Sequence, residues 1–203
     1  MVSSPPDTPS VRARGGTRVT SRDLAQIAVF AALIAALGLA PGMYLGPAVP
    51  ITLQTLGVML TGAIIGARNG CAAVLLCEVL VAMGLPLLSG GRGGIAVFAG
   101  PSAGYLIGWL AGVIVIGTLT VRLLPKYPAL PALAVTALGG IIVIYTPGIG
   151  WTAITTGSLW AAIVGAALYL PGDIAKVITT VLVATPVHRA WPGLIHRRSA
   201  QRS

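Results

Sequence analysis

The feature of this sequence that most constrains its fold is a series of apolar segments, each about as long as a membrane is thick. A helix needs about 20 apolar residues to cross the ~30 Å hydrocarbon core of a bilayer. Such segments fill most of the 203 residues, and only 8% of the residues are charged, against about 25% in an average soluble domain. Too few polar side chains are present to cover a water-soluble globule. We therefore predict an all-α, polytopic membrane protein.

Six segments are apolar enough to be transmembrane helices, although some are short and would need tilt or a locally thinner bilayer. They are residues 22–40, 51–67, 69–84, 101–123, 130–147 and 171–188. Residues 1–21 are polar, basic and rich in Pro and Gly, and we predict that they are disordered. Residues 189–203 form a second basic tail. The first apolar segment has an alternative reading as a secretory signal, but Pro41 follows its small residues and makes a poor cleavage site, so we favour a retained helix.

Basic residues predict the orientation of these helices. Four arginines lie in or directly after the N-terminal tail and four in the C-terminal tail, and Arg68, Arg122 and Lys126 lie in two of the connections. The three other connections contain one basic residue among them, Arg92. Lys and Arg collect on the cytoplasmic side of membrane proteins. This rule predicts a six-helix bundle with both termini in the cytoplasm, and it explains the net charge of +9 without a nucleic-acid partner.

Residues 151–170 are apolar enough to suggest a seventh crossing. A seventh crossing would place Lys126 and the C-terminal tail on opposite sides of the membrane, against the positive-inside rule. We therefore predict that this segment is an outer loop with a partly inserted or interfacial helix. Trp151 and Trp160 suit an interfacial location.

Four charged residues remain when the tails and the cytoplasmic loops are set aside: Glu78, Arg92, Asp173 and Lys176. Charges in a membrane are costly, so such residues indicate a functional site by default. The predicted topology places all four in the outer half of the bundle, and the spacing of Asp173 and Lys176 puts both on one helix face. We predict a polar pocket that opens outward. The alternative is two structural ion pairs, or side chains that merely snorkel to the interface.

Further residues near this predicted pocket allow two readings each. The loop around Arg92 is rich in glycine, which suits either a lid over a ligand or a plain linker. Gln54 lies in an apolar segment and needs a hydrogen-bond partner, either the ligand or a neighbouring helix. Tyr105 faces either the pocket or the lipid interface. The loop glycines are Gly90, Gly91, Gly93 and Gly94.

Small residues mark the first apolar segment, where Ala25, Ala28, Ala32 and Ala36 recur at spacings of three and four. Such stripes let helices approach closely in lipid. They serve either packing within the bundle or docking of another membrane protein. The two cysteines, Cys71 and Cys77, lie six residues apart in one segment and point to different helix faces, so we interpret them as packing residues rather than as a disulfide or metal site.

Together these segments resemble the BioY family, the biotin-specific substrate-binding (S) components of energy-coupling-factor (ECF) transporters. The resemblance covers roughly residues 22–188, and its strength is the joint order and spacing of five motifs. The motifs are Val49-Pro50-Ile51-Thr52-Leu53-Gln54, Gly84-Leu85-Pro86, Gly90-Gly91-Arg92-Gly93-Gly94, Gly100-Pro101-Ser102-Ala103-Gly104-Tyr105 and Pro171-Gly172-Asp173-Ile174-Ala175-Lys176.

The resemblance implies a subunit of a bacterial or archaeal cell membrane that captures biotin outside and delivers it to the cytoplasm. A transmembrane coupling subunit and two cytoplasmic ATPases would be its partners. ATP would be used by these partners only, since this sequence has no phosphate-binding G-x-x-x-x-G-K-[ST] motif. The chain itself would not be an enzyme and would need no cofactor.

The resemblance also implies roles for single residues. Asp173 and Lys176 would contact biotin, the Arg92 loop would help to close the site, and Glu78 stands where some relatives are expected to have Asn. Gln54 and Tyr105 complete the predicted biotin-binding set. Ala28 and Ala32 match the docking motif of the S components.

Three other functions stay open on the sequence alone. An S component for another vitamin would share the bundle and the alanine stripe. A secondary transporter would use Asp173 or Glu78 as a proton site. An intramembrane enzyme is the weakest alternative, because His188 and His196 both lie near the C-terminal tail and no catalytic constellation stands within the apolar segments.

Overall fold

The structure is a computed structural model that describes residues 19–40, 42 and 52–195. Most of the predicted disordered N-terminal segment, the Val49-Pro50-Ile51 part of the first motif and residues 196–203 lie outside the described residues. Every regular element among the described residues is helical, as predicted. The elements are α1 (Ser21–Leu39), α2 (Gln54–Ala82), η1 (Ile95–Phe98), α3 (Ala103–Leu123), α4 (Ala129–Ala137), η2 (Leu138–Val143), α5 (Ile144–Thr156), α6 (Leu159–Ala167) and α7 (Leu170–Ala190).

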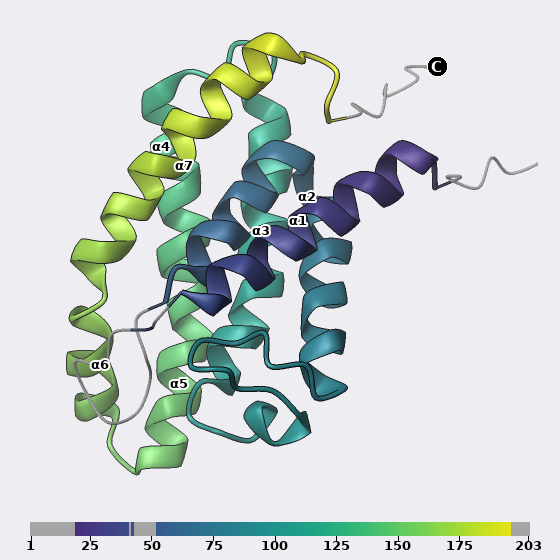
Figure 1. The fold of residues 1–203 in the computed structure, drawn as a ribbon. Coiled ribbons are helices and arrows are strands. Elements are labelled where there is room, and N and C mark those ends of the chain that lie inside the picture. Colours follow the sequence, from purple (N-terminus) through teal and green to yellow (C-terminus); the bar gives the residue numbers. More distant parts are fainter. Residues whose placement is uncertain (1–18, 41, 43–51, 196–203) are drawn as a thin grey trace, which may run out of the picture.

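Helix α1 begins with a capping box and crosses α2 obliquely (Figure 1). Thr20 Oγ1 accepts a hydrogen bond from the Asp23 amide at 3.2 Å, and the Asp23 carboxylate accepts one from the Thr20 amide at 2.9 Å. Asn69 Nδ2 donates to Asp23 Oδ1 at 2.8 Å and to Gln26 Oε1 at 2.9 Å. The start of α1 is thereby fastened to α2.

Helix α2 reverses direction at Gly66 and consists of two limbs. Gly66 has φ 76° and ψ −177°, which no residue within a helix adopts. A Cβ atom added at Gly70 would lie 3.4 Å from Thr61 Cγ2, whereas nine residues of straight helix span about 13 Å. The two limbs therefore pack against each other, and Arg68 lies at their turn.

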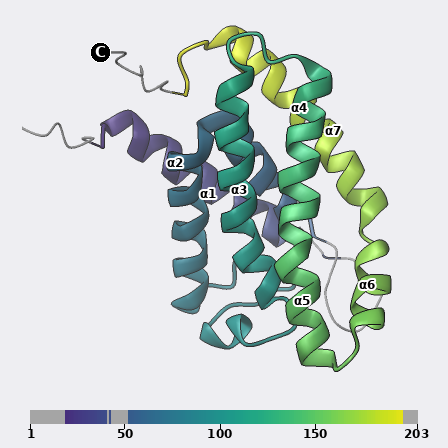
Figure 2. The same ribbon diagram turned by 180° about the vertical axis from the view of Figure 1, so that it is seen from behind.

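The predicted segment 130–147 is too short, because α4, η2 and α5 form one continuous helix from residue 129 to residue 156 (Figure 2). Pro147 lies inside this helix and cannot donate to Val143, the last residue of the π-helical segment η2. Close packing holds the helix past this point, since a Cβ at Gly104 of α3 would lie 2.2 Å from the Pro147 carbonyl oxygen. Trp151 Nε1 also donates to Gly100 O at 2.9 Å.

Residues 151–170 contain no single helix long enough to cross a membrane. They contain the end of α5 and the nine-residue helix α6, whose start is capped by Ser158. Five helices among the described residues are long and apolar enough to cross a membrane, with α4 and α5 counted as one. Six apolar segments result when the two limbs of α2 are counted separately, which agrees with the predicted number.

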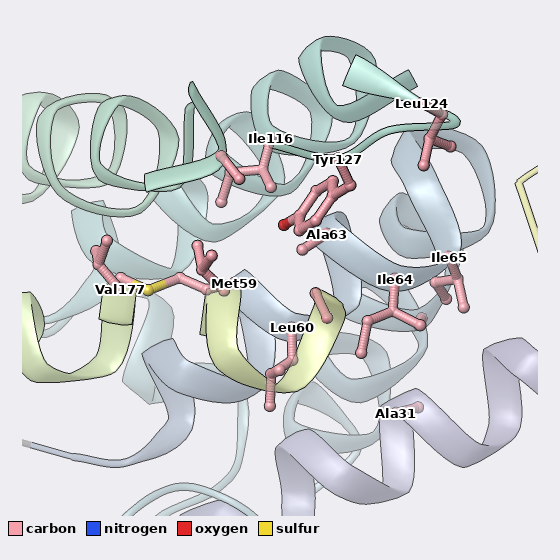
Figure 3. Close-up of a cluster of buried hydrophobic side chains, with 14 residues drawn as sticks. Ala31, Met59, Leu60, Ala63, Ile64, Ile65, Ile116, Leu124, Tyr127 and Val177 are labelled. Carbon is pink, nitrogen blue, oxygen red and sulfur yellow. The ribbon is translucent and has the colours of Figure 1, made fainter. Parts of the chain in front are cut away.

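Buried aliphatic side chains hold the bundle together in two clusters. One surrounds the first limb of α2, where Met59 extends toward Val177 of α7 and Ile116 of α3 (Figure 3). The other lies between the second limb of α2 and α3 and includes Val74 and Trp109. These clusters set the rotation of each helix and so decide which polar side chains face one another.

Candidate functional site

The first two turns of α7 carry a buried ion pair. Lys176 Nζ lies 2.6 Å from Asp173 Oδ1. The two residues are only 7% and 3% exposed. Both were predicted as site residues, and the helical spacing of three brings them together as expected. A buried pair with such short contacts needs further polar partners to offset the loss of water.

Two other helices supply those partners. Thr55 Oγ1 of α2 accepts a hydrogen bond from Lys176 Nζ at 2.9 Å and lies 3.4 Å from Asp173 Oδ1. Tyr145 of α5 donates its hydroxyl to Asp173 Oδ2 at 2.5 Å. Neither residue was among the predicted site residues. For Tyr145 the signal was available, because a tyrosine hydroxyl within an apolar helix needs a hydrogen-bond partner.

The glycine-rich loop between α2 and α3 is a folded hairpin rather than a plain linker. Leu88 and Arg92 form an antiparallel bridge, with amide-to-carbonyl hydrogen bonds of 3.0 and 3.2 Å. The turn between them requires Gly90 and Gly91, whose φ angles of 77° and 69° are unfavourable for other residues. Gly94 anchors the loop through a 2.7 Å hydrogen bond from its amide to the Val81 carbonyl.

This hairpin positions the side chain of Arg92. Its Nε donates to Ser89 O at 3.1 Å and its Nη1 lies 3.5 Å from Ser102 Oγ. Both acceptors are uncharged, and among the described residues Arg92 forms no ion pair, unlike Lys176 on α7. The guanidinium is thus positioned without a carboxylate among the described residues to neutralise it.

Gln54 supports the hairpin. Its Nε2 donates to Leu87 O at 3.0 Å and its Oε1 accepts from the Ser89 amide at 3.4 Å. Both ends of the amide are used by the backbone of the loop. The sequence left open whether Gln54 bonds to a ligand or to the protein. Its hydrogen bonds in the structure are to the protein, although Gln54 also lines the cavity.

A cavity with about 570 Å³ of empty space, part of it open to solvent, connects these groups. Its lining combines charged groups, namely the pair on α7 and Arg92, with aromatic and aliphatic side chains. Tyr105 lies at this cavity, with its ring edge-to-face against Tyr145 at 6.0 Å between centroids. The lining residues are Thr52, Gln54, Thr55, Leu88, Arg92, Ser102, Tyr105, Leu106, Trp109, Tyr145, Tyr169, Asp173 and Lys176.

Two of the aromatic residues add hydrogen-bonding capacity. Trp109 is buried, and its indole N–H has no hydrogen-bond partner among the described residues. Tyr169 lies just before α7, where burial raises the pKa of its hydroxyl. The phenol is therefore neutral at neutral pH and keeps its proton.

Glu78 is the predicted site residue that the structure does not bring to the cavity wall. It is buried, and its Oε1 has no hydrogen-bond partner in the described part of the chain. Along α2 it follows Val74 by four residues and precedes Val81 by three, so it shares their face. Both valines are buried in an apolar cluster, and neither they nor Glu78 line the cavity, so this face of α2 does not reach it.

The alanine stripe of α1 faces away from the bundle. Ala28 and Ala32 are exposed, while Ala31 and Ile34 on the adjacent face are buried. These two alanines therefore do not pack against the described part of the bundle, which excludes the first of their two predicted roles. Docking of another membrane protein stays a prediction.

Comparisons with known proteins agree on one family. The sequence profile of the BioY family matches residues 11–193. The biotin transporter BioY of Rhodobacter capsulatus is 47% identical over 187 residues, covering 87% of this chain and 98% of the relative. The probable biotin transporter BioY of Bacillus subtilis is 42% identical over 171 residues, covering 83% and 91%.

A solved structure has the same fold. It is the S-component for biotin from an ECF-type ABC transporter, and it matches with a TM-score of 0.79 and 32% sequence identity. The match covers 83% of this chain and 91% of that chain. The similarity thus extends over most of both chains.

Proposed function

This chain belongs to the BioY family, and on that premise we propose that it is the biotin-binding S component of an ECF-type vitamin uptake transporter. The observation that carries the proposal is the cavity that joins Asp173, Lys176 and Arg92 across aromatic and aliphatic walls. Proteins of this family are transport subunits and not enzymes. The chain captures biotin and passes it through the membrane.

The chemistry of biotin matches the two polar parts of the cavity. The ureido ring has two N–H donors and one carbonyl acceptor, which suit the Asp173 carboxylate and the Lys176 ammonium. The carboxylate of biotin suits Arg92, whose hydrogen bonds in the structure go to two neutral oxygens. An Arg–carboxylate pair is charge-assisted and stronger than a neutral hydrogen bond.

The middle of the ligand is apolar, and part of the cavity lining is apolar too. The thiophane ring and the valeryl chain would contact Tyr105, Leu106 and Trp109, which line the same cavity as the charged groups. Gln54 acts through the loop that it holds. Glu78 would contact biotin only after leaving the apolar cluster that surrounds it.

The proposed topology places both termini in the cytoplasm of a bacterial or archaeal cell and opens the cavity outward. The support is the distribution of Lys and Arg in the sequence. The partners would be a transmembrane coupling subunit, docked on the exposed face of Ala28 and Ala32, and two cytoplasmic ATPases. ATP would be used by these ATPases only, and this chain would need no cofactor.

The test is a titration of the purified full-length chain with biotin, in parallel with Asp173→Asn and Lys176→Ala. We expect both substitutions to weaken binding by at least tenfold, since a charge-assisted hydrogen bond contributes about 1.5–3 kcal/mol. Unchanged affinity in both variants would refute the proposed site. A panel of other vitamins separates biotin from a different ligand, and uptake that survives ATP depletion but not loss of the proton gradient would favour a secondary transporter.

A further inference from the structure

A second hollow, separate from the proposed biotin site, lies between α4–η2 and α7. It contains about 730 Å³ of empty space, much of it open, and its lining is entirely aliphatic. Leu130 and Ile141 mark its two ends on the first helix, and Ile174 and Ile178 line it from α7. Between these lie Ala134 and Ala137, whose small side chains leave the groove unfilled.

The length of the groove fits one leaflet of a bilayer. Eleven residues separate Leu130 from Ile141, which corresponds to about 17 Å at 1.5 Å per helical residue. Half of the ~30 Å hydrocarbon core is about 15 Å. An extended acyl chain that lay in the groove would thus run from the membrane interface to the middle of the bilayer.

Basic residues gather at the Leu130 end of the groove. Tyr127, in the turn before α4, packs its ring against His188 of α7 at 4.8 Å between centroids. His188 is itself fixed by a 2.8 Å hydrogen bond to the Ala63 carbonyl. Lys126 and Arg189 are the sequence neighbours of this ring pair, and both are exposed. The ring contact therefore holds two cations at the end where the groove begins.

No carboxylate among the described residues balances these cations. The sequence has four acidic residues, and one of them, Asp7, lies outside the described part. Asp23 is bound to Thr20 and Asn69 at the start of α1. Glu78 is buried in α2, and Asp173 is paired at the opposite end of α7. The positive rim thus fits an anion from outside the described chain.

We propose that this groove is a binding site for an anionic phospholipid, with one acyl chain between α4 and α7 and the phosphate beside Lys126 and Arg189. The aliphatic lining fits the acyl chain, and the charge at one end distinguishes an anionic headgroup from a zwitterionic one. The site goes beyond the proposed transport function and does not depend on it. Figure 1 shows α4 and α7 side by side, away from α1.

The experiment is a native mass spectrometry titration of the full-length chain, released from detergent, with phosphatidylglycerol and with phosphatidylcholine of the same acyl chains. We expect phosphatidylglycerol to bind more tightly by about fivefold for each cation that contacts its phosphate. The double variant Lys126→Gln/Arg189→Gln removes the charges at exposed positions and should bring the preference to within about twofold of unity. Arg22→Gln, an exposed cation at the start of α1, is the matched control and should keep the preference.

A second variant tests the groove itself. Ala134→Trp places a large side chain at an exposed lining position and should weaken binding of both lipids by at least fivefold, because it occupies the space of the acyl chain. Thermal unfolding midpoints of all variants check that they fold. The proposal is overturned if the wild type shows no preference, if Arg22→Gln loses as much preference as the double variant, or if Ala134→Trp binds both lipids as the wild type does. A protein dimer that forms without lipid and is lost in Ala134→Trp would also overturn it, since the groove would then hold a second copy.

Discussion

Replacing Lys176 by Met separates a ligand-binding role of the α7 ion pair from a purely structural one. In Lys176→Met, the Asp173 carboxylate keeps the Tyr145 and Thr55 hydroxyls but loses the ammonium group at 2.6 Å. Breaking a buried pair by removing one partner costs about 3–5 kcal/mol, because the other charge stays buried without compensation. In Asp173→Asn/Lys176→Met both charges are gone, and most of the lost stability should return.

Biotin affinity should behave differently from stability. If Asp173 and Lys176 contact the ligand, the single and the double variants all lose charge-assisted hydrogen bonds of about 1.5–3 kcal/mol each. At about 1.4 kcal/mol per factor of ten, the affinity should fall by about 10- to 100-fold in Lys176→Met and by more in the double variant. The double variant should thus be stable and yet bind biotin poorly.

The measurements are isothermal titration calorimetry with biotin and thermal unfolding followed by tryptophan fluorescence, both in detergent. Lys126→Met is the matched control, since it makes the same change at an exposed position and should alter neither quantity in detergent. A double variant that binds biotin with wild-type affinity would refute the reasoning. The pair would then serve only to join α7 to α2 and α5.

Three further outcomes follow from the geometry. Gly93→Ala should weaken biotin binding by more than about tenfold while the bundle stays folded, because its Cβ would lie 2.2 Å from the Leu85 carbonyl oxygen and displace the Arg92 hairpin. Gly100→Ala is the control, since the nearest contact of its Cβ would be at 3.6 Å. Equal biotin affinities of the two variants in calorimetry would contradict the role of the loop. Glu78→Gln should change the calorimetric affinity by less than about twofold, since Glu78 does not line the cavity; a larger loss would show that Glu78 reaches the ligand. Ala32→Trp should abolish co-purification of the coupling subunit and ATPases without lowering biotin affinity, because Ala32 is exposed; a complex that persists would place the docking face elsewhere.

Several features of the site could be predicted from the sequence because they are local. Asp173 and Lys176 lie three residues apart on one helix, so the helical repeat alone puts them on one face. The cost of charge in a membrane also distinguishes these residues and Arg92 from the rest of the sequence. The folded hairpin also has a local cause, since the left-handed φ angles of Gly90 and Gly91 are open to glycine and strained for most other residues.

Other features could not be predicted, because they depend on which helices become neighbours. Thr55 and Tyr145 are 118 and 28 residues from Asp173 in sequence, and nothing in their own segments shows that they meet it. The end of α5 was predicted too early, because its contacts with α3 at Gly104 outweigh the interruption at Pro147. Local patterns do not contain such distant contacts.

The sequence by itself determined that the chain forms a helical membrane bundle. It also determined which charged residues lie in or near the membrane and therefore indicate a functional site. Both conclusions depend on the free energy of transfer from water to lipid, which is set by the composition of each segment separately. The tertiary structure decided which of the four charges share a cavity. Glu78 is buried on the face of α2 that carries Val74 and Val81, away from the cavity wall, while Gln54 and the hairpin hold Arg92 at that wall. Rotation of a helix about its own axis is set by its neighbours, and only the folded bundle specifies them.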